Sequence, residues 1–296
     1  MSLPVRDYVE LMKPRIVLLV IVTAVAGAVV EHSLLSSPWR LALVLLGITL
    51  TAGSANAFNQ YFERHLDAQM ERTRARRPLP LHRMAPRNAL VFAIAIGIGA
   101  TVLLALVGNA LTAALALGTI VFYGFFYTLW LKPRTVHNIV IGGAAGAMGP
   151  IIAWSAGAGT LALPAVLMFL VIFLWTPPHF WALAVCVRDD YRKVKIPMLP
   201  IVRGEAETFR QIVWYSVSLA LLTMMMPLVN AGGAVLALVA LPLGGLFVWK
   251  AVQARRAASV ARAWDVFGYS IVYLFVLFLG IIADAIWHVP IGRLLS

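Results

Sequence analysis

The chain has 296 residues, of which 61% are hydrophobic and only 12% are charged. A soluble domain carries about 25% charged residues, so the composition excludes a soluble globular protein and indicates one embedded in a membrane. The formal net charge of +12 does not require a nucleic-acid partner, because basic residues in a membrane protein more often report the orientation of its helices.

Apolar stretches long enough to cross a bilayer follow one another along the chain. A spanning helix needs roughly 20 apolar residues, and these stretches are rich in Leu, Val, Ala and Ile without the period-2 alternation of a β-barrel strand. We expect nine spans, at residues 16–33, 39–60, 88–108, 110–130, 138–157, 162–185, 209–229, 233–253 and 266–288. The sequence therefore predicts an all-α fold, a polytopic transmembrane helix bundle that forms a single domain over residues 1–296.

The first span has a competing interpretation. Lys13 and Arg15 precede an apolar run that ends in small residues, as in a cleaved signal peptide. Eight further spans follow it, so a first anchor helix is the better interpretation.

The basic residues gather on one side of the membrane when the N-terminus is placed in the cytoplasm and the nine spans alternate. Of the 24 Lys and Arg residues, 22 then fall in cytoplasmic segments, and only Arg40 and Arg293 do not. Cytoplasmic loops carry an excess of Lys and Arg, and a wrong number of spans would have scrambled this pattern. We therefore expect a multi-pass protein of the cell inner membrane, with its N-terminus and its active site toward the cytoplasm.

Two clusters of acidic residues lie at the cytoplasmic ends of spans. Asn59, Glu63 and Asp67 are spaced i, i+4, i+8, which places them along one face of the helix that leaves the second span. Asp189 and Asp190 follow the sixth span, an equivalent position if the bundle has two halves. Polar side chains at a membrane boundary are costly and tend to be functional. We expect all five to hold a metal ion and all but Asp189 to act in catalysis.

Carboxylates that converge at one membrane face among arginines are what a magnesium–diphosphate site requires. Mg²⁺ takes oxygen ligands and is usually held by one or two carboxylates plus phosphate oxygens, while Lys and Arg neutralise the remaining phosphate charge. The candidate diphosphate-binding residues are Lys13, Arg15, Arg72, Arg77, Lys132 and Lys195. The single cysteine, Cys186, makes a thiolate metal site implausible. The competing interpretation is a solvated loop whose arginines only set the topology.

Five stretches of the sequence carry a likeness to known proteins. They are ELMKPRI at 10–16, NQYFERHLDAQMERTRARRPLP at 59–80, YTLWLKPRTVHNIVIGGAAGAMGPIIAW at 127–154, WTPPHFWALAV at 175–185 and DYRKVKIPMLPIVRG at 190–204. Together they resemble the protoheme IX farnesyltransferase (heme O synthase) family, within the intramembrane aromatic prenyltransferase superfamily. The acidic motif alone would indicate only the superfamily, and the last two stretches indicate the heme branch. Glu63 departs from the family pattern, which usually has Asp there, but keeps a carboxylate.

The resemblance implies a reaction in which a farnesyl group passes from farnesyl diphosphate to a vinyl group of heme B, with hydration, giving heme O and diphosphate. It implies Mg²⁺ as the cofactor, with heme B a substrate, and the lipid bilayer as the surroundings. A downstream heme-modifying or oxidase-assembly membrane protein is a further implied partner, and no nucleic acid is expected. The chemistry agrees, because cations stabilise a departing diphosphate and a helix bundle in lipid shields the allylic cation from water.

His179 lies in the sixth span beside the prolines Pro177 and Pro178. One interpretation is a buried histidine that hydrogen-bonds a carbonyl group freed by those prolines. The other, which follows from the resemblance, is contact with the porphyrin, either by ligating the iron or by orienting the macrocycle. On the second interpretation we expect His179, Trp175 and Tyr191 to bind heme.

Two other functions remain open on the sequence alone. A polyprenyltransferase acting on a quinone-precursor aromatic acid would use the same diphosphate apparatus with a phenolic acceptor, and an assay of heme B against hydroxybenzoate separates the two. A non-catalytic membrane heme carrier or transporter would not need acidic clusters on one side only, because transporters commonly place their ions near the midplane.

Overall fold

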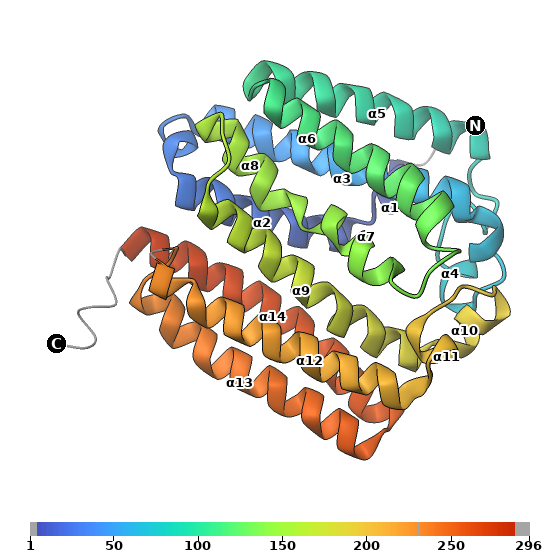
Figure 1. The fold of residues 1–296 in the computed structure, drawn as a ribbon. Helices are drawn as coiled ribbons and strands as arrows, with labels where there is room; N and C mark the ends of the chain where they lie inside the picture. The colour runs from blue at the N-terminus through green and yellow to red at the C-terminus, as the bar shows by residue number, and fades with distance from the viewer. Residues whose placement is uncertain (1–4, 230, 288–296) are drawn as a thin grey trace.

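The computed structural model describes residues 5–229 and 231–287, and the regular secondary structure of that part is helical (Figure 1). In chain order the elements are α1 (Val5–Met12), α2 (Pro14–Glu31), η1 (Ser33–Ser36), α3 (Pro38–Asp67), α4 (Glu71–Arg74), α5 (Pro86–Val107), α6 (Ala110–Val121), η2 (Phe122–Leu131), α7 (Asn138–Gly146), α8 (Met148–Ala158), α9 (Leu163–Cys186), α10 (Arg188–Lys193), α11 (Leu199–Val202), α12 (Gly204–Met225), η3 (Pro227–Val229), α13 (Ala234–Ala257) and α14 (Val260–Trp287). η1 and η3 are short 3-10 helices, and η2 is a π-helix.

Nine segments of the described chain are long and apolar enough to cross a membrane, which confirms the expected all-α bundle. Three of these spans join two elements: α6 with η2, α7 with α8, and α12 with η3. The boundaries differ from expectation at α3, which continues to Asp67, at α12, which begins at Gly204, and at α14, which begins at Val260. The expected last residue of the ninth span, at 288, lies outside the described residues. The extension of α3 matters for function because it carries the first acidic cluster.

Proline and glycine mark several helix ends. Pro14, Pro38 and Pro86 occupy the first turn of α2, α3 and α5, where the missing N–H group would have had no partner within the helix. α8 ends at Ala158 and is followed by Gly159, whose φ of 73° lies in the left-handed region that glycine adopts without steric cost. These signals are local, which is why the sequence alone places most of the spans within a few residues.

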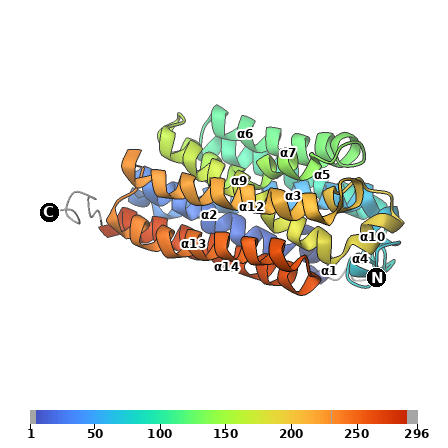
Figure 2. The same cartoon turned by 60° about the horizontal axis from the view of Figure 1, so that its bottom comes forward.

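The helices α2 and α9 lie in the middle of the bundle (Figures 1 and 2). α9 packs against α7, α8, α12 and α14, while α2 packs against α3, α8 and α14. α2 comes close to α8 because Gly27 has no side chain: a Cβ there would lie 2.7 Å from the carbonyl oxygen of Pro150. Close backbone packing of this kind drives helix association in lipid, where there is no hydrophobic difference between helix and solvent.

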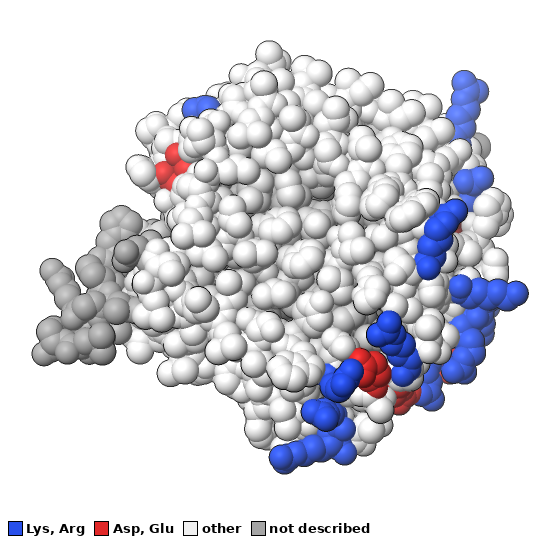
Figure 3. Space-filling view, in the orientation of Figure 1, with Lys and Arg blue, Asp and Glu red and all other residues white. Residues whose placement is uncertain are grey.

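Charged side chains gather at one end of the bundle. Figure 3 shows Lys and Arg concentrated at the end where α4, α10 and α11 lie, beside a long uncharged surface. At the other end Arg40 is turned inward and donates to the carbonyl oxygens of Val107 and Ala156, at 2.7 Å each. The charged end is also the end at which α3 and α9 finish, so both acidic clusters lie there.

Candidate functional site

The last turns of α3 carry three polar side chains on one face. Asn59, Glu63 and Asp67 are only 2%, 5% and 3% exposed. Removing an ionised carboxylate from water costs several kcal/mol unless a partner of opposite charge compensates for it. The two acids therefore need cations close by, and segments distant in the sequence supply them.

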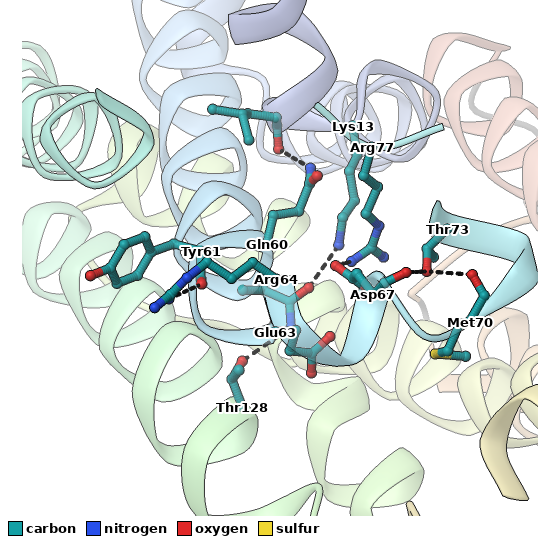
Figure 4. Close-up of polar contacts among 12 residues, drawn as sticks. Lys13, Gln60, Tyr61, Glu63, Arg64, Asp67, Met70, Thr73, Arg77 and Thr128 are labelled. Carbon is teal, nitrogen blue, oxygen red and sulfur yellow. Dashed lines mark hydrogen bonds and ion pairs between the residues drawn. The ribbon is translucent and has the colours of Figure 1, made fainter. Parts of the chain in front are cut away.

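Each carboxylate forms an ion pair with a different segment. Lys132, the residue directly after η2, pairs with Glu63, and Arg77, in the connection between α4 and α5, pairs with Asp67. The side chains of Lys132 and Arg77 are only 15% and 18% exposed, so both pairs are largely shielded from water. Figure 4 shows Arg77 directed at Asp67 beyond the turn of α3 that carries Glu63.

Lys13 supplies a third cation, at the corner between α1 and α2. Its Nζ donates to Asn59 Oδ1 at 3.0 Å. Burial of the ammonium group lowers the pKa of Lys13 to about 7, and the like charge of Arg77 acts in the same direction, whereas Glu63 and Asp67 favour the protonated form. A bound anion would favour that form further, so Lys13 suits a position beside a diphosphate.

The π-helix η2 forms the opposite wall of the site. Thr128 donates to the carbonyl oxygen of Tyr123 at 2.7 Å, the i−5 pattern of a π-helix, and accepts a hydrogen bond from Asn59 Nδ2 at 3.3 Å. Figure 4 shows Thr128 and Lys13 on different sides of α3. π-helical segments frequently occur at functional sites, and this one leads to Lys132, which pairs with Glu63 on the carboxylate face of α3.

The connection after α3 is held from two directions. Thr73 Oγ1 donates to the carbonyl oxygen of Asp67 at 2.8 Å. The carboxylate oxygens of Asp190, on α10, accept the backbone N–H groups of Glu71 and Arg72 at 3.0 Å each. The second acidic cluster therefore meets the first through the backbone of this connection, which leads on to Arg77.

The remaining residues expected at the site lie closer to solvent. Asp189 has a side chain that is 75% exposed, and it pairs with Arg192 at 3.3 Å. Arg15 and Lys195 are exposed and make no ion pair within the described chain, and Arg72 is half-buried. The metal role of Asp189 and the diphosphate roles of Arg15, Arg72 and Lys195 stay predictions, as do the roles of the other residues expected at the site.

Two of the residues expected to bind heme, Trp175 and His179, form part of an aromatic column between α9 and α14. The ring of His179 stacks between those of Trp175 and Phe267, with centroid distances of 4.3 and 4.7 Å. His179 Nδ1 lies 2.7 Å from Ser270 Oγ, and Trp175 Nε1 donates to the carbonyl oxygen of Ser270 at 2.7 Å. Tyr191, on α10, is buried in the same core as Trp175. The histidine thus bonds a hydroxyl group of α14 and not a carbonyl group freed by the prolines.

Several residues of the site were missed by the sequence analysis. Asn56 and Gln60 make contacts from α3 to the end of α1, Thr128 bonds Asn59, and Ser270 faces His179. All four are polar residues within expected spans, and a polar side chain in a span is itself an indication of function. Their partners could not be named, because each lies on another helix.

The oxygen atoms on α3 fit a magnesium ion that shares its coordination with a diphosphate. Within the described residues, no group of three or more His, Cys, Asp and Glu side chains lies together as a metal site in its own right. Two carboxylates and one amide oxygen do lie in a row, on Glu63, Asp67 and Asn59. Mg²⁺ usually takes one or two carboxylates and completes its shell with phosphate oxygens and water, so this donor set suits it.

Comparison with known proteins finds relatives along nearly the whole chain. A family model described as the UbiA prenyltransferase family matches residues 20–281. The protoheme IX farnesyltransferase of Nostoc sp. is 42% identical over 287 residues, which are 95% of this chain and 89% of the relative. That of Symbiobacterium thermophilum is 44% identical over 282 residues, 95% of this chain and 94% of the relative. The chain spans about half the length, 52%, of the two Roseiflexus relatives, which are 41% identical.

Solved structures share the fold at low sequence identity. The structure of a digeranylgeranylglyceryl phosphate synthase superposes with a TM-score of 0.79 at 17% identity, covering 96% of this chain and 99% of that one. A UbiA homolog from Archaeoglobus fulgidus, bound to DMAPP and Mg²⁺, superposes with a TM-score of 0.69 at 14% identity, covering 92% and 99%. At such identities the likeness shows the fold alone.

Proposed function

The chain belongs to the UbiA prenyltransferase family, and from that premise we propose that its activity is protoheme IX farnesyl transfer. It is a multi-pass membrane prenyltransferase that moves a farnesyl group from farnesyl diphosphate to a vinyl group of heme B. Water adds in the same reaction, and the products are heme O and diphosphate.

One observation carries the proposal: a row of buried oxygen donors on α3 faces cations from three other segments. The contacts lie at the charged end of an otherwise apolar bundle: Lys13 with Asn59, Arg77 with Asp67, and Lys132 with Glu63. A diphosphate needs such cations, and its prenyl chain needs an apolar surface beside them. The arrangement supplies both within one site.

Mg²⁺ is the cofactor that fits this donor set, and Asn59, Glu63 and Asp67 are the residues we propose to hold it. When bound, it would neutralise charge on the diphosphate as the bond to the farnesyl group breaks. With a positive ion at the carboxylates, Lys132 and Arg77 would be free to turn from them to the diphosphate oxygens. A UbiA homolog from Archaeoglobus fulgidus is bound to DMAPP and Mg²⁺, which supports Mg²⁺ as the cofactor.

The chain's own residues then have separate tasks in the transfer. Lys13, Arg77 and Lys132 stabilise the diphosphate that leaves when the C–O bond of the substrate breaks, by charge-assisted contacts. The apolar walls of the bundle keep water from the allylic cation until the vinyl group of heme B attacks it. Water captures the cation that forms next to the porphyrin and loses a proton, which leaves a hydroxyl group on the product.

The column of stacked rings between α9 and α14 is the surface we propose for heme B. Trp175 and His179 are the aromatic side chains of α9 that would contact the macrocycle, and Tyr191, on α10, is buried in the same core as Trp175. The propionates of heme would then lie toward the cytoplasmic lysines and arginines. A membrane protein that modifies heme further or assembles an oxidase is the expected recipient of the product.

We place the charged end of the bundle in the cytoplasm and the protein in the cell inner membrane. The support is the concentration of Lys and Arg at that end (Figure 3), since such residues are retained on the cytoplasmic side. Both substrates would then be reached from the cytoplasm or the inner leaflet.

The decisive experiment is mass spectrometry of heme extracted from membranes with and without the protein. We expect a hydroxyethylfarnesyl heme only when the protein is present, and the purified protein should form it from heme B and farnesyl diphosphate with Mg²⁺. Prenylation of hydroxybenzoate in place of heme B would instead indicate a quinone-type enzyme. Heme B that is bound but recovered unchanged would indicate a carrier.

A further inference from the structure

Two side-chain amides on α3 hold the C-terminal end of α1. Asn56 Nδ2 donates to the carbonyl oxygen of Met12 at 3.0 Å, and Gln60 Nε2 donates to the carbonyl oxygens of Glu10 and Leu11 at 3.2 and 2.9 Å. The last four carbonyl groups of a helix have no partner within it, and the amides satisfy three of these. Asn56 and Gln60 are 6% and 1% exposed, so these contacts are shielded from water.

Further contacts fasten α1 in the same place. Gly53, one turn before Asn56 on α3, allows a close approach: a Cβ there would lie 2.5 Å from Met12 Cε. At the outer side of α1, Arg83 pairs with the carboxylates of Asp7, at 3.2 Å, and Glu10. The end of α1 is therefore held on both sides by side chains that are not its sequence neighbours.

Lys13 is the residue directly after this fastened helix end. Its φ of 57° and ψ of 67° are left-handed, a conformation that costs energy for any residue with a side chain and persists where the surroundings impose it. Pro14 begins α2 at once, and its ring disfavours the right-handed helical conformation for the residue before it. The result is a sharp corner at which Lys13 Nζ reaches Asn59 Oδ1 at 3.0 Å.

We propose that Asn56 and Gln60 are positioning residues for Lys13, which they aim at the diphosphate of the prenyl substrate by holding the carbonyl groups at the end of α1. The inference rests on the proposed function, because Lys13 has a diphosphate to meet only in a prenyltransferase. The two amides flank Asn59 on one helix. α3 thus carries Asn59, a proposed metal ligand, and also holds the helix end that positions Lys13 opposite it. The distance between Asn59 and Lys13 is therefore fixed by contacts between helices and not by a loop.

The test uses the full chain in lipid nanodiscs, titrated with farnesyl S-thiolodiphosphate in the presence of Mg²⁺. Gln60→Leu keeps most of the side-chain volume and removes the donor. We expect the affinity for the analogue to fall about tenfold, as for a weakened charge-assisted contact, with heme B binding unchanged. Gln69→Leu is the matched control, since Gln69 donates to the carbonyl oxygen of His65 on the exposed surface, and it should bind both like the parent.

A double-mutant cycle separates positioning from general stability. If Gln60 acts through Lys13, Gln60→Leu should cause no further loss of affinity in a Lys13→Met background, whereas independent effects would multiply. Asn56→Leu should behave in the same way. Multiplying losses, an unchanged affinity in Gln60→Leu, or loss of heme B binding in both amide variants would overturn the proposal. A parent protein that bound no farnesyl S-thiolodiphosphate would overturn the proposed function as well.

Discussion

Asp67 ties the acidic face of α3 to the connection that follows it. Its carboxylate pairs with Arg77, and its carbonyl oxygen accepts the hydroxyl group of Thr73. Glu63 forms its ion pair with Lys132, the residue directly after η2. Removal of one partner from a buried ion pair costs about 3–5 kcal/mol, and both alanine and asparagine at Asp67 remove the charge that faces Arg77. Asparagine keeps the shape of the side chain and an oxygen that can accept from Arg77, so it is the better substitution, and its folding must be measured beside its activity.

At the residue scale, Asp67→Asn should lower kcat/KM at least about 100-fold, because the neutral amide stabilises neither a metal ion nor the developing charge. Glu63→Asp keeps a carboxylate, and its kcat/KM should stay within about tenfold of the parent. Heme O formation in nanodiscs is the assay. The thermal unfolding midpoint of Asp67→Asn, compared with that of the parent, is the folding control. Full activity of Asp67→Asn at limiting Mg²⁺ would remove this residue from the mechanism.

At the scale of elements, contacts between segments far apart in the chain build the site. α10 hydrogen-bonds the backbone that precedes Arg77, and Lys132, directly after η2, pairs with a residue of α3. α14 contacts His179 of α9 through a serine hydroxyl group. None of these pairs is adjacent in the sequence. Each can be tested by a change that weakens one contact and leaves the helices intact.

Asp190 and Asp189 test whether the second acidic cluster acts by charge or by holding the connection after α3. Asp190→Asn has only one oxygen for the two N–H groups of Glu71 and Arg72, so we expect the apparent KM for farnesyl diphosphate to rise about tenfold. Asp189→Asn alters an exposed side chain and should change it less than about twofold. Steady-state kinetics at saturating heme B measures both. Equal losses would indicate that both carboxylates hold the metal, as the sequence suggested.

The contact of α9 with α14 separates a heme-binding histidine from a packing histidine. His179→Ala should reduce both heme B binding and heme farnesylation by about tenfold or more, because a stacked aromatic group of this size is lost. Heme B binding is followed by the absorbance spectrum. Binding of farnesyl S-thiolodiphosphate should be nearly unchanged, since that site is built from other elements. Ser270→Ala removes only the hydroxyl group that faces the ring. If both variants bind and farnesylate heme B like the parent, the aromatic column only packs α9 against α14 and does not bind heme.

At the scale of the whole molecule, the bundle has one charged end and one nearly uncharged end, from which an orientation in the membrane is predicted. α4, α10 and α11 lie at the charged end, and the connection between α8 and α9 lies at the other. On the positive-inside rule, we expect the active site to face the cytoplasm. Cys186 is the only cysteine in the sequence, so a single substitution provides a background for labelling.

In a Cys186→Ser background, we expect Leu161→Cys to react with a membrane-impermeant maleimide added to intact cells. Arg74→Cys should react only after the membranes are opened. Leu161 is 44% exposed in the α8–α9 connection, and Arg74 is exposed at the charged end. The reverse pattern would show that the bundle is inserted the other way round and would move the active site to the outer face.

Local rules were enough for the spans, their order and the position of the acidic face. The length of an apolar run, prolines such as Pro14 and Pro38 at helix starts, and the i, i+4 spacing of Asn59 and Glu63 act within a few residues of one another. The accumulation of Lys and Arg at one end of the bundle likewise follows from their positions between the spans in the sequence. These properties can therefore be predicted without knowing how the helices pack.

Only the tertiary structure decided which cation meets which oxygen atom. Lys132 reaches Glu63 across 69 positions of the chain, and His179 meets Ser270 across 91. Gln60 holds the end of α1 across 49. Such pairings follow from helix packing, in which many weak contacts act together, and no local pattern in the sequence encodes the result. The sequence alone therefore determined which residues were available for chemistry, and packing determined the partner of each.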